Sequence, residues 1–111
     1  MNTTNNNLSF YGIVRLIRNN VNDVVFLLDE EATVNETMNQ IADHMSALKA
    51  ATPDTTEGKL IADIVRNAVG TVARTVKAYM DREISRVCAV ELINRQEHII
   101  WSAWALIKKG E

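Results

Sequence analysis

The stretch IADIVRNAVGTVARTVKAYMDREISRVCAVEL, residues 61 to 92, decides the fold because its apolar face changes direction partway along. Its first part carries apolar residues that hold one direction on a helix advancing about 100° per residue. The apolar residues after Glu83 point well away from that direction, so the buried face changes near Asp81 to Glu83. The first set is Ile61, Ile64, Val65, Ala68, Val72, Val76 and Tyr79, and the second is Ile84, Val87, Cys88 and Leu92.

This change of face leaves two alternatives for the C-terminal half. From Lys59 to Lys109 the chain contains no proline, and Gly70 is its only glycine. An unbroken helix of about 50 residues would be about 75 Å long, far beyond the diameter of a small domain. Either the chain bends near Asp81 to Glu83 into a fourth helix, or one long helix packs first on its own domain and then on a second subunit.

A first amphipathic helix is predicted to begin near residue 8. Ser9 or Asn7 can cap it, since short polar side chains accept hydrogen bonds from free N–H groups at a helix start. The acidic run Asp29 to Glu31 is unfavourable at the negative end of the helix dipole, so the helix should end there. Its apolar stripe contains Phe10, Ile13, Val14, Ile17, Val21, Val24, Val25 and Leu28.

A second helix is predicted to begin at Val34, where Thr33 and Glu36 have the spacing of a capping box. The only proline, Pro53, prevents it from continuing. Asp54 with Glu57 then gives a cap for the third helix. The apolar stripe of the second helix contains Met38, Ile41, Met45 and Leu48, with Ala42 between them.

Composition and periodicity together predict an all-α bundle of three or four amphipathic helices, the C-terminal part long, and a dimeric assembly. The apolar fraction is 47%, and no segment alternates apolar and polar residues as a strand does. Residues 1–7, MNTTNNN, are expected to be a disordered polar tail. Residues 8–111 are expected to form a single helical domain.

No motif for catalysis, metal binding or phosphate binding is found. His44 and His98 are the only histidines, and neither has a glutamate at the i, i+3 spacing of a carboxylate-bundle metal site. Cys88 lies among apolar residues, so we expect a buried and unreactive thiol. The four glycines stand alone rather than in a loop that could hold phosphate. We therefore expect no cofactor, no metal and no enzymatic activity.

The C-terminal segment is the candidate dimer interface. Its apolar residues surround a helix on nearly all sides, which requires burial from more than one direction. Tryptophans are also enriched among the residues that contribute most to binding. A fully enclosed core helix is the alternative. The candidate interface residues are Ile100, Trp101, Trp104 and Ile107.

A set of basic residues favours an alternative function, that of a DNA-binding regulator. Most of them project in nearly the same helical direction, although Asp63 and Asp81 interrupt the stripe. The net charge of -2 does not favour nucleic acid as a partner. The candidate nucleic-acid contacts are Lys59, Arg66, Arg74, Lys77 and Arg95.

The sequence therefore favours a non-enzymatic protein-interaction module, a small homodimeric regulatory or adaptor protein that also binds an unidentified protein. We expect a cytoplasmic location, because the chain has one cysteine and no basic and apolar leader at its N-terminus. No membrane association is expected. The longest apolar run, Ile99 to Ile107, is well short of the roughly 20 residues that span a bilayer.

Overall fold

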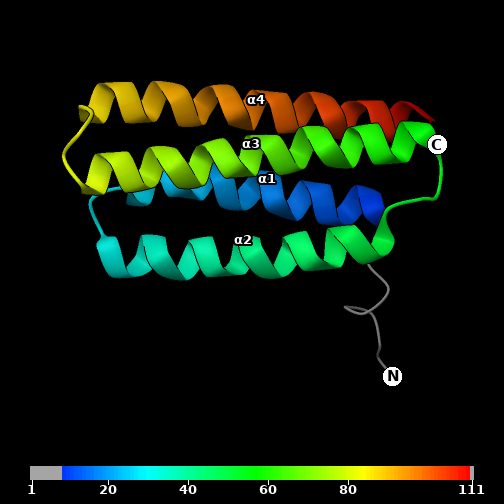
Figure 1. The fold of residues 1–111 in the computed structure, drawn as a ribbon, viewed down its shortest axis with the longest axis horizontal. Coiled ribbons are helices and arrows are strands. Elements are labelled where there is room, and N and C mark those ends of the chain that lie inside the picture. Colours follow the sequence, from blue (N-terminus) through cyan, green and yellow to red (C-terminus); the bar gives the residue numbers. More distant parts are fainter. Residues whose placement is uncertain (1–8, 111) are drawn as a thin grey trace.

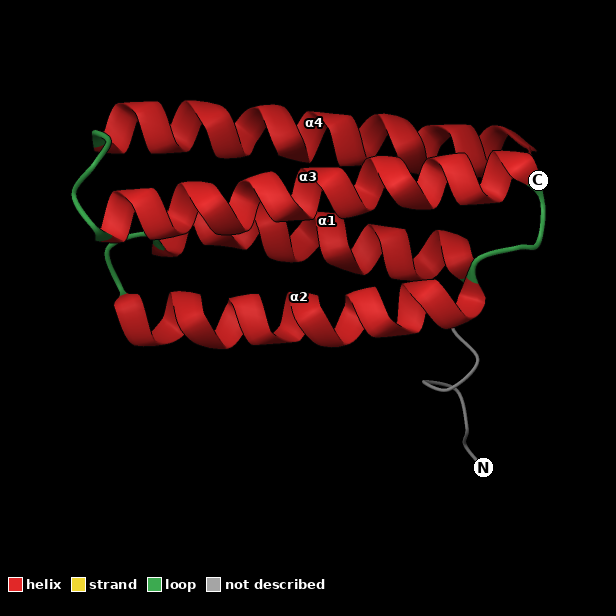
Figure 2. Ribbon diagram, viewed as in Figure 1, coloured by secondary structure: helices red, strands yellow, loops and turns green. Residues whose placement is uncertain are grey.

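The computed structural model describes residues 9–110 and contains four helices that run antiparallel in chain order (Figure 1). No strand occurs within these residues (Figure 2). The prediction of an all-helical bundle is confirmed, with four helices rather than three. The predicted tail, residues 1–7, lies outside the described residues. The helices are α1 (Phe10–Leu27), α2 (Glu31–Ala51), α3 (Thr56–Met80) and α4 (Arg86–Gly110).

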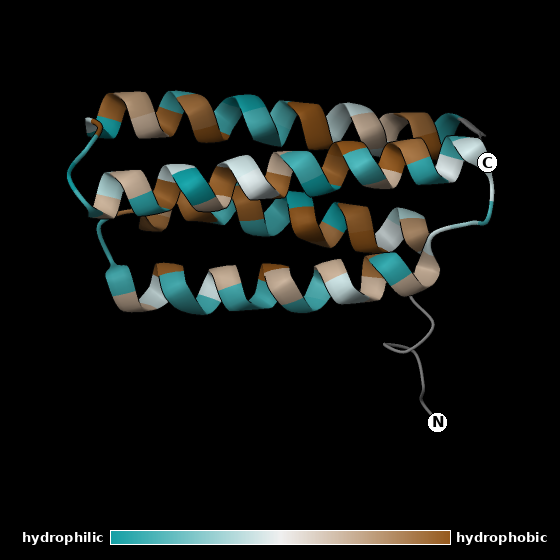
Figure 3. Ribbon diagram, viewed as in Figure 1, coloured by the Kyte–Doolittle hydropathy of each residue, from teal (hydrophilic) through white to brown (hydrophobic). Residues whose placement is uncertain are grey.

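Helix α1 is the central element of the bundle. It packs along both α2 and α4, whereas α3 packs mainly along α4 (Figure 1). Between α2 and α3 the packing is sparse. Apolar residues of all four helices form one buried core, and hydrophobic and hydrophilic segments alternate along each helix (Figure 3). On α1 the fully buried side chains are Val14, Ile17, Val21 and Val24.

Polar contacts fix how α1 lies against its two neighbours. Asn20 is buried. Its side-chain nitrogen donates to Gln40 of α2, and its side-chain oxygen lies 2.8 Å from the Nδ1 nitrogen of His44. On the other side, the Arg18 guanidinium donates to the buried Glu97 carboxylate of α4 at 2.5 Å. Buried polar groups left unpaired are costly, so these pairs favour one register of the helices over shifted ones.

The start of α1 is as predicted, and the start of α2 is not. The Ser9 hydroxyl accepts from the Gly12 N–H at 3.0 Å, which confirms one of the two predicted caps. Helix α2 begins at Glu31, so Thr33 lies in its first turn and the predicted capping box is wrong. The acidic residues that end α1 also begin α2, where negative charge at the positive end of the helix dipole is favourable.

The turn between α2 and α3 follows from its proline and a threonine. Helix α2 ends at Ala51, and Thr52 takes the extended conformation that proline imposes on the residue before it. The cap of α3 is Thr55, whose hydroxyl accepts from the Gly58 N–H at 3.0 Å. The predicted cap at Asp54 is wrong by one residue.

The reversal between α3 and α4 depends on Arg82. This residue has φ of 62°, a left-handed conformation that glycine adopts more readily than any other residue. Around it the Arg82 N–H donates to the Tyr79 carbonyl and the Glu83 N–H donates to the Ala78 carbonyl, which is the pattern of a Schellman motif. The chain therefore bends where the apolar face changes, and the alternative of one long helix is wrong.

The first turn of α4 corrects the expectation for Cys88. The Ser85 hydroxyl accepts from the Cys88 N–H at 3.1 Å, in the manner of a cap. The buried side of the helix begins at Ala89, one residue later and about 100° around the axis. Cys88 is consequently exposed rather than buried.

The two threonines provide a test of the helix starts. We expect Thr55→Ala to lower the free energy of unfolding by about 1 kcal/mol, because a cap hydrogen bond is lost. Thr33→Ala is the matched control, and within a helical turn it should change stability by less than about 0.5 kcal/mol. Urea unfolding of both variants measures the difference. Equal losses would contradict the assigned helix starts.

Arg82 provides a second test. We expect Arg82→Gly to stabilise the protein by about 0.5 to 1 kcal/mol, because glycine removes the steric cost of the left-handed conformation. Arg82→Ala keeps that cost and should stay near the wild type, which separates the backbone effect from loss of the arginine side chain. Thermal unfolding of the three proteins measures it, and an unchanged or lower midpoint for the glycine variant would refute the argument.

Candidate functional site

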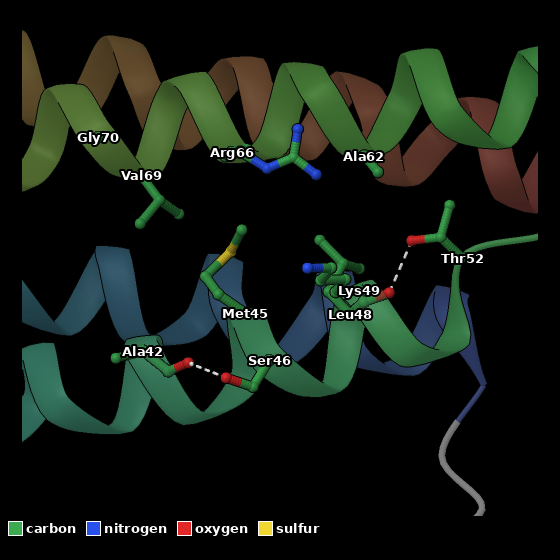
Figure 4. Close-up of a pocket in the computed structure, with 10 residues that line it drawn as sticks. All are labelled: Ala42, Met45, Ser46, Leu48, Lys49, Thr52, Ala62, Arg66, Val69 and Gly70. Atoms are coloured by element: carbon green, nitrogen blue, oxygen red, sulfur yellow. Dashed lines mark hydrogen bonds between the residues drawn. The ribbon is translucent and has the colours of Figure 1, made fainter.

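Two cavities of the described surface lie between α2 and α3. One cavity of about 480 Å³ lies beside the C-terminal half of α2, and a second of about 490 Å³ lies beside its N-terminal half. Both cavities are walled by α2 on one side and α3 on the other. Figure 4 shows the first of them, with Met45 of α2 and Val69 of α3 pointing toward one another across the gap. We call the two cavities together the α2–α3 groove.

Each wall of the groove follows a heptad pattern, in which the residues alternate at spacings of four and three. Such a pattern is the one by which helices pack side by side in coiled coils. Because α2 and α3 pack sparsely here, most of these residues stay partly or fully exposed, whereas Ala62 and Val76 are buried. The α2 wall includes Glu31, Asn35, Met38, Ala42, Met45 and Lys49 at this spacing, followed by the capping residue Thr52 and with Ser46 and Leu48 beside them, and the α3 wall includes Ala62, Arg66, Val69, Ala73, Val76 and Met80.

Methionines concentrate in this groove. Met38, Met45 and Met80 are the methionines of residues 9–110, and all three line it. Each is partly buried and packs against the edge of the core. Methionine side chains are flexible and polarisable, and they are over-represented at surfaces that bind other proteins. At the centre of the groove the walls carry small residues, Ala42, Gly70 and Ala73.

The charges of the groove are divided between its two ends. The cavity beside the end of α2 is lined by Lys49 and Arg66 and by no acidic residue. The cavity at the opposite end is lined by Glu31 and Asp81, together with Lys77. Arg66 and Lys77 pair with acidic residues of their own helix. Among residues 9–110, neither Glu31 nor Lys49 makes an ion pair, although each complements the dipole of α2, Glu31 in its first turn and Lys49 in its last.

The residues predicted to form a dimer interface lie on α4, which has no close packing with α2. Trp101 is 43% exposed, Ile107 is half-buried, and Ile100 is completely buried in the core. The Trp104 ring stacks on Tyr11 with 5.0 Å between ring centroids, and Lys108 lies over it. The structure does not gather the four residues on one surface, and their role as an interface stays a prediction.

The five basic residues predicted to contact nucleic acid are mostly neutralised by neighbours. Arg74 donates to the Thr71 hydroxyl, and Arg95 lies on α4 rather than α3. Acidic neighbours thus interrupt the stripe, and its role in contacting nucleic acid stays a prediction. The ion pairs are Lys59 with Asp54, Arg66 with Asp63, Lys77 with Asp81 and Arg95 with Glu91.

The histidines and the cysteine are dispersed. His44 forms a hydrogen bond with Asn20 through its Nδ1 nitrogen. His98 and Cys88 are exposed on α4. Within the described part of the chain, no group of three or more histidine, cysteine, aspartate or glutamate side chains is arranged to hold a metal ion. Nor is any helix in that part long and apolar enough to cross a membrane.

A second polar cluster ties the α1–α2 turn to the α3–α4 turn. Asp29 accepts a short hydrogen bond from the Tyr79 hydroxyl and a 3.0 Å hydrogen bond from Arg86. These two donors lower the pKa of the Asp29 carboxyl below its ordinary value of 3.8. The same hydrogen bond raises the pKa of the Tyr79 hydroxyl above 10.0. The cluster closes one end of the bundle and is complete only while Asp29 is charged and Tyr79 is neutral.

Comparison of the chain with protein-family models, with curated proteins and with solved structures finds no match.

The Asp29 cluster predicts how stability depends on pH. A lowered carboxyl pKa contributes stability that is complete above 3.8 and is lost as the pH falls through the lower folded value. A raised phenol pKa contributes stability that is complete below 10.0 and is lost as the pH rises through the higher folded value. We therefore expect Asp29→Asn to be less stable than the wild type at pH 7, with the difference shrinking below pH 3.8 and above pH 10.0.

Urea unfolding at pH 3, 7 and 10.5 would measure this difference. Asp23→Asn, which changes an exposed carboxylate on α1, is the matched control and should show no such window. Equal stabilities of Asp29→Asn and the wild type at pH 7 would show that the two turns are not held together by this cluster.

Proposed function

We propose that the chain is a non-enzymatic protein-interaction module, a small homodimeric regulatory or adaptor protein, and that the α2–α3 groove is its docking surface. The observation that carries the proposal is the concentration of methionines in a groove whose two walls both follow a heptad pattern. A groove of this kind suits a helix with a matching apolar stripe, which is a common mode of protein recognition. Apolar surface left partly open is also a mark of interaction sites.

The other exposed apolar side chains do not support an equally continuous site. They are distributed over three helices, and exposed apolar residues are common on protein surfaces. They are Phe26 on α1, Leu60 and Ile64 on α3, and Val87, Ile99, Trp101 and Leu106 on α4.

A cytoplasmic location is part of the same proposal. Cys88 is exposed and is the only cysteine of the chain. In an oxidising compartment an exposed single thiol forms disulfides between molecules, whereas reducing conditions keep it free. The exposed thiol therefore supports a reducing environment.

Photo-crosslinking tests the docking surface. A photoreactive amino acid at Ser46, which is exposed and lines the groove, should form defined protein adducts in the native cells. The same amino acid at Asn22, an exposed residue of α1, is the matched control and should form none. Adding Ala42→Arg, which fills the centre of the groove, should abolish the adducts at Ser46. Adducts that are absent, or that persist with Ala42→Arg, would refute the groove as a docking surface.

A further inference from the structure

The residues of α2 that line the groove form a strip whose residue types are arranged almost symmetrically about its centre. The strip consists of six of the α2 residues that line the groove, together with the capping residue Thr52, and Ala42 stands at its middle. The six are Glu31, Asn35, Met38, Ala42, Met45 and Lys49, and Ser46 and Leu48 of α2 line the groove beside them. On either side of Ala42 lies a methionine, Met38 toward one end and Met45 toward the other. Glu31 lies near one end and Lys49 near the other. The strip is therefore apolar at its centre, acidic near one end and basic near the other.

Two strips of this kind are complementary to each other when they run antiparallel. A twofold axis at Ala42 would place Met38 of one copy against Met45 of the other. The same axis would place Lys49 of each copy opposite Asn35 of the second copy, one helical turn or about 6 Å along the axis from its Glu31. The long Lys49 side chain can span this offset, so that an ion pair forms at each end between charges that make no ion pair in the single chain. A symmetric interface uses the same patch on both subunits, so it requires this kind of self-complementarity.

We infer that the occupant of the α2–α3 groove is a second copy of the chain, whose α2 lies antiparallel to the first α2 about Ala42. The inference rests on the proposed docking surface and names its partner. Each α2 then occupies the groove of the other copy, so one helix is buried on both of its apolar sides. The 21 residues of α2 give a contact about 31 Å long.

The position of α3 supports the same orientation. Because α3 is antiparallel to α2, an incoming antiparallel α2 runs parallel to α3. Its Glu31 then approaches the end lined by Lys49 and Arg66, and its Lys49 approaches the end lined by Asp81. The opposite orientation would place like charges together at both ends, which costs binding energy. The N-terminal residues MNTTNNN carry too little apolar surface to fill the groove instead.

A pair of charge reversals tests the inference, with the full chain labelled at its single exposed Cys88. Lys49→Glu alone and Glu31→Lys alone each place like charges at both ends of a symmetric dimer, so self-association should weaken about tenfold at low salt. A mixture of the two variants restores both ion pairs in the mixed dimer. Donor-labelled Lys49→Glu and acceptor-labelled Glu31→Lys should therefore show energy transfer when mixed, at concentrations where each variant alone is monomeric.

Matched controls are Lys109→Glu and Glu36→Lys, which change exposed charges outside the groove. Both should leave the wild-type mass, expected at twice 12.4 kDa by sedimentation, unchanged. Circular dichroism should show intact helicity in every variant.

Two results would overturn the inference. A wild-type chain that sediments as a monomer at high micromolar concentration would exclude a second copy as the occupant. A dimer that is indifferent to both reversals would place the interface elsewhere, for instance on α4. The crosslink at Ser46 separates these failures from failure of the docking surface: an adduct with a different protein retains the groove, and no adduct removes it.

Discussion

The left-handed turn at Arg82 is the constraint on which the rest of the structure depends. A non-glycine residue in this conformation costs roughly 1 to 2 kcal/mol. The cost is tolerated because the turn allows the apolar stripes of α3 and α4 to bury one another, and because the Schellman hydrogen bonds satisfy the end of α3. The same turn brings Tyr79 and Arg86 to Asp29, so the reversal of α3 also fastens the end of α1.

The central position of α1 determines where the bundle is closed and where it stays open. Helix α4 is held from two sides, by α1 and by α3, whereas α2 is held mainly by α1. The inner side of α2 meets α1 through Val34, Ile41 and Leu48, with the Asn20 and His44 contact beside them. The next side of the helix, with Met38 and Met45, then faces α3 across the cavities. The groove is therefore open because α2 packs closely on α1 and only sparsely on α3.

The sequence left three or four helices open, but it predicted the limits of helices where one residue type forces the outcome. Pro53 ended α2, Ser9 capped α1, and the change of apolar face marked the bend after Met80. It failed where neighbouring residues offer equivalent chemistry. Thr33 and Asp54 are both good caps in principle, but the packing of the helices selected starts at Glu31 and Thr56 instead. Local spacing alone could not choose between them.

The groove was not predicted, although the residues that form it were noticed. Met38 and Met45 were placed in one apolar stripe with Ile41 and Leu48, and periodicity gives the direction of such a stripe without saying how many neighbours cover it. Only the arrangement of the helices divides the stripe into a covered side and an open side.

The arrangement of the helices also affects which of two surfaces, the α2–α3 groove or the tryptophans of α4, is better suited to bind a partner. On α4, Trp104 packs on Tyr11 and Trp101 lies against it, although the buried Trp104 Nε1 has no hydrogen-bond partner among residues 9–110. In the groove, the methionines meet only the edge of the core and the two end charges have no partner among residues 9–110. Binding of a partner is stabilised most where apolar surface is still exposed and charges have no partner. These contacts therefore favour the α2–α3 groove over the tryptophans as a docking surface.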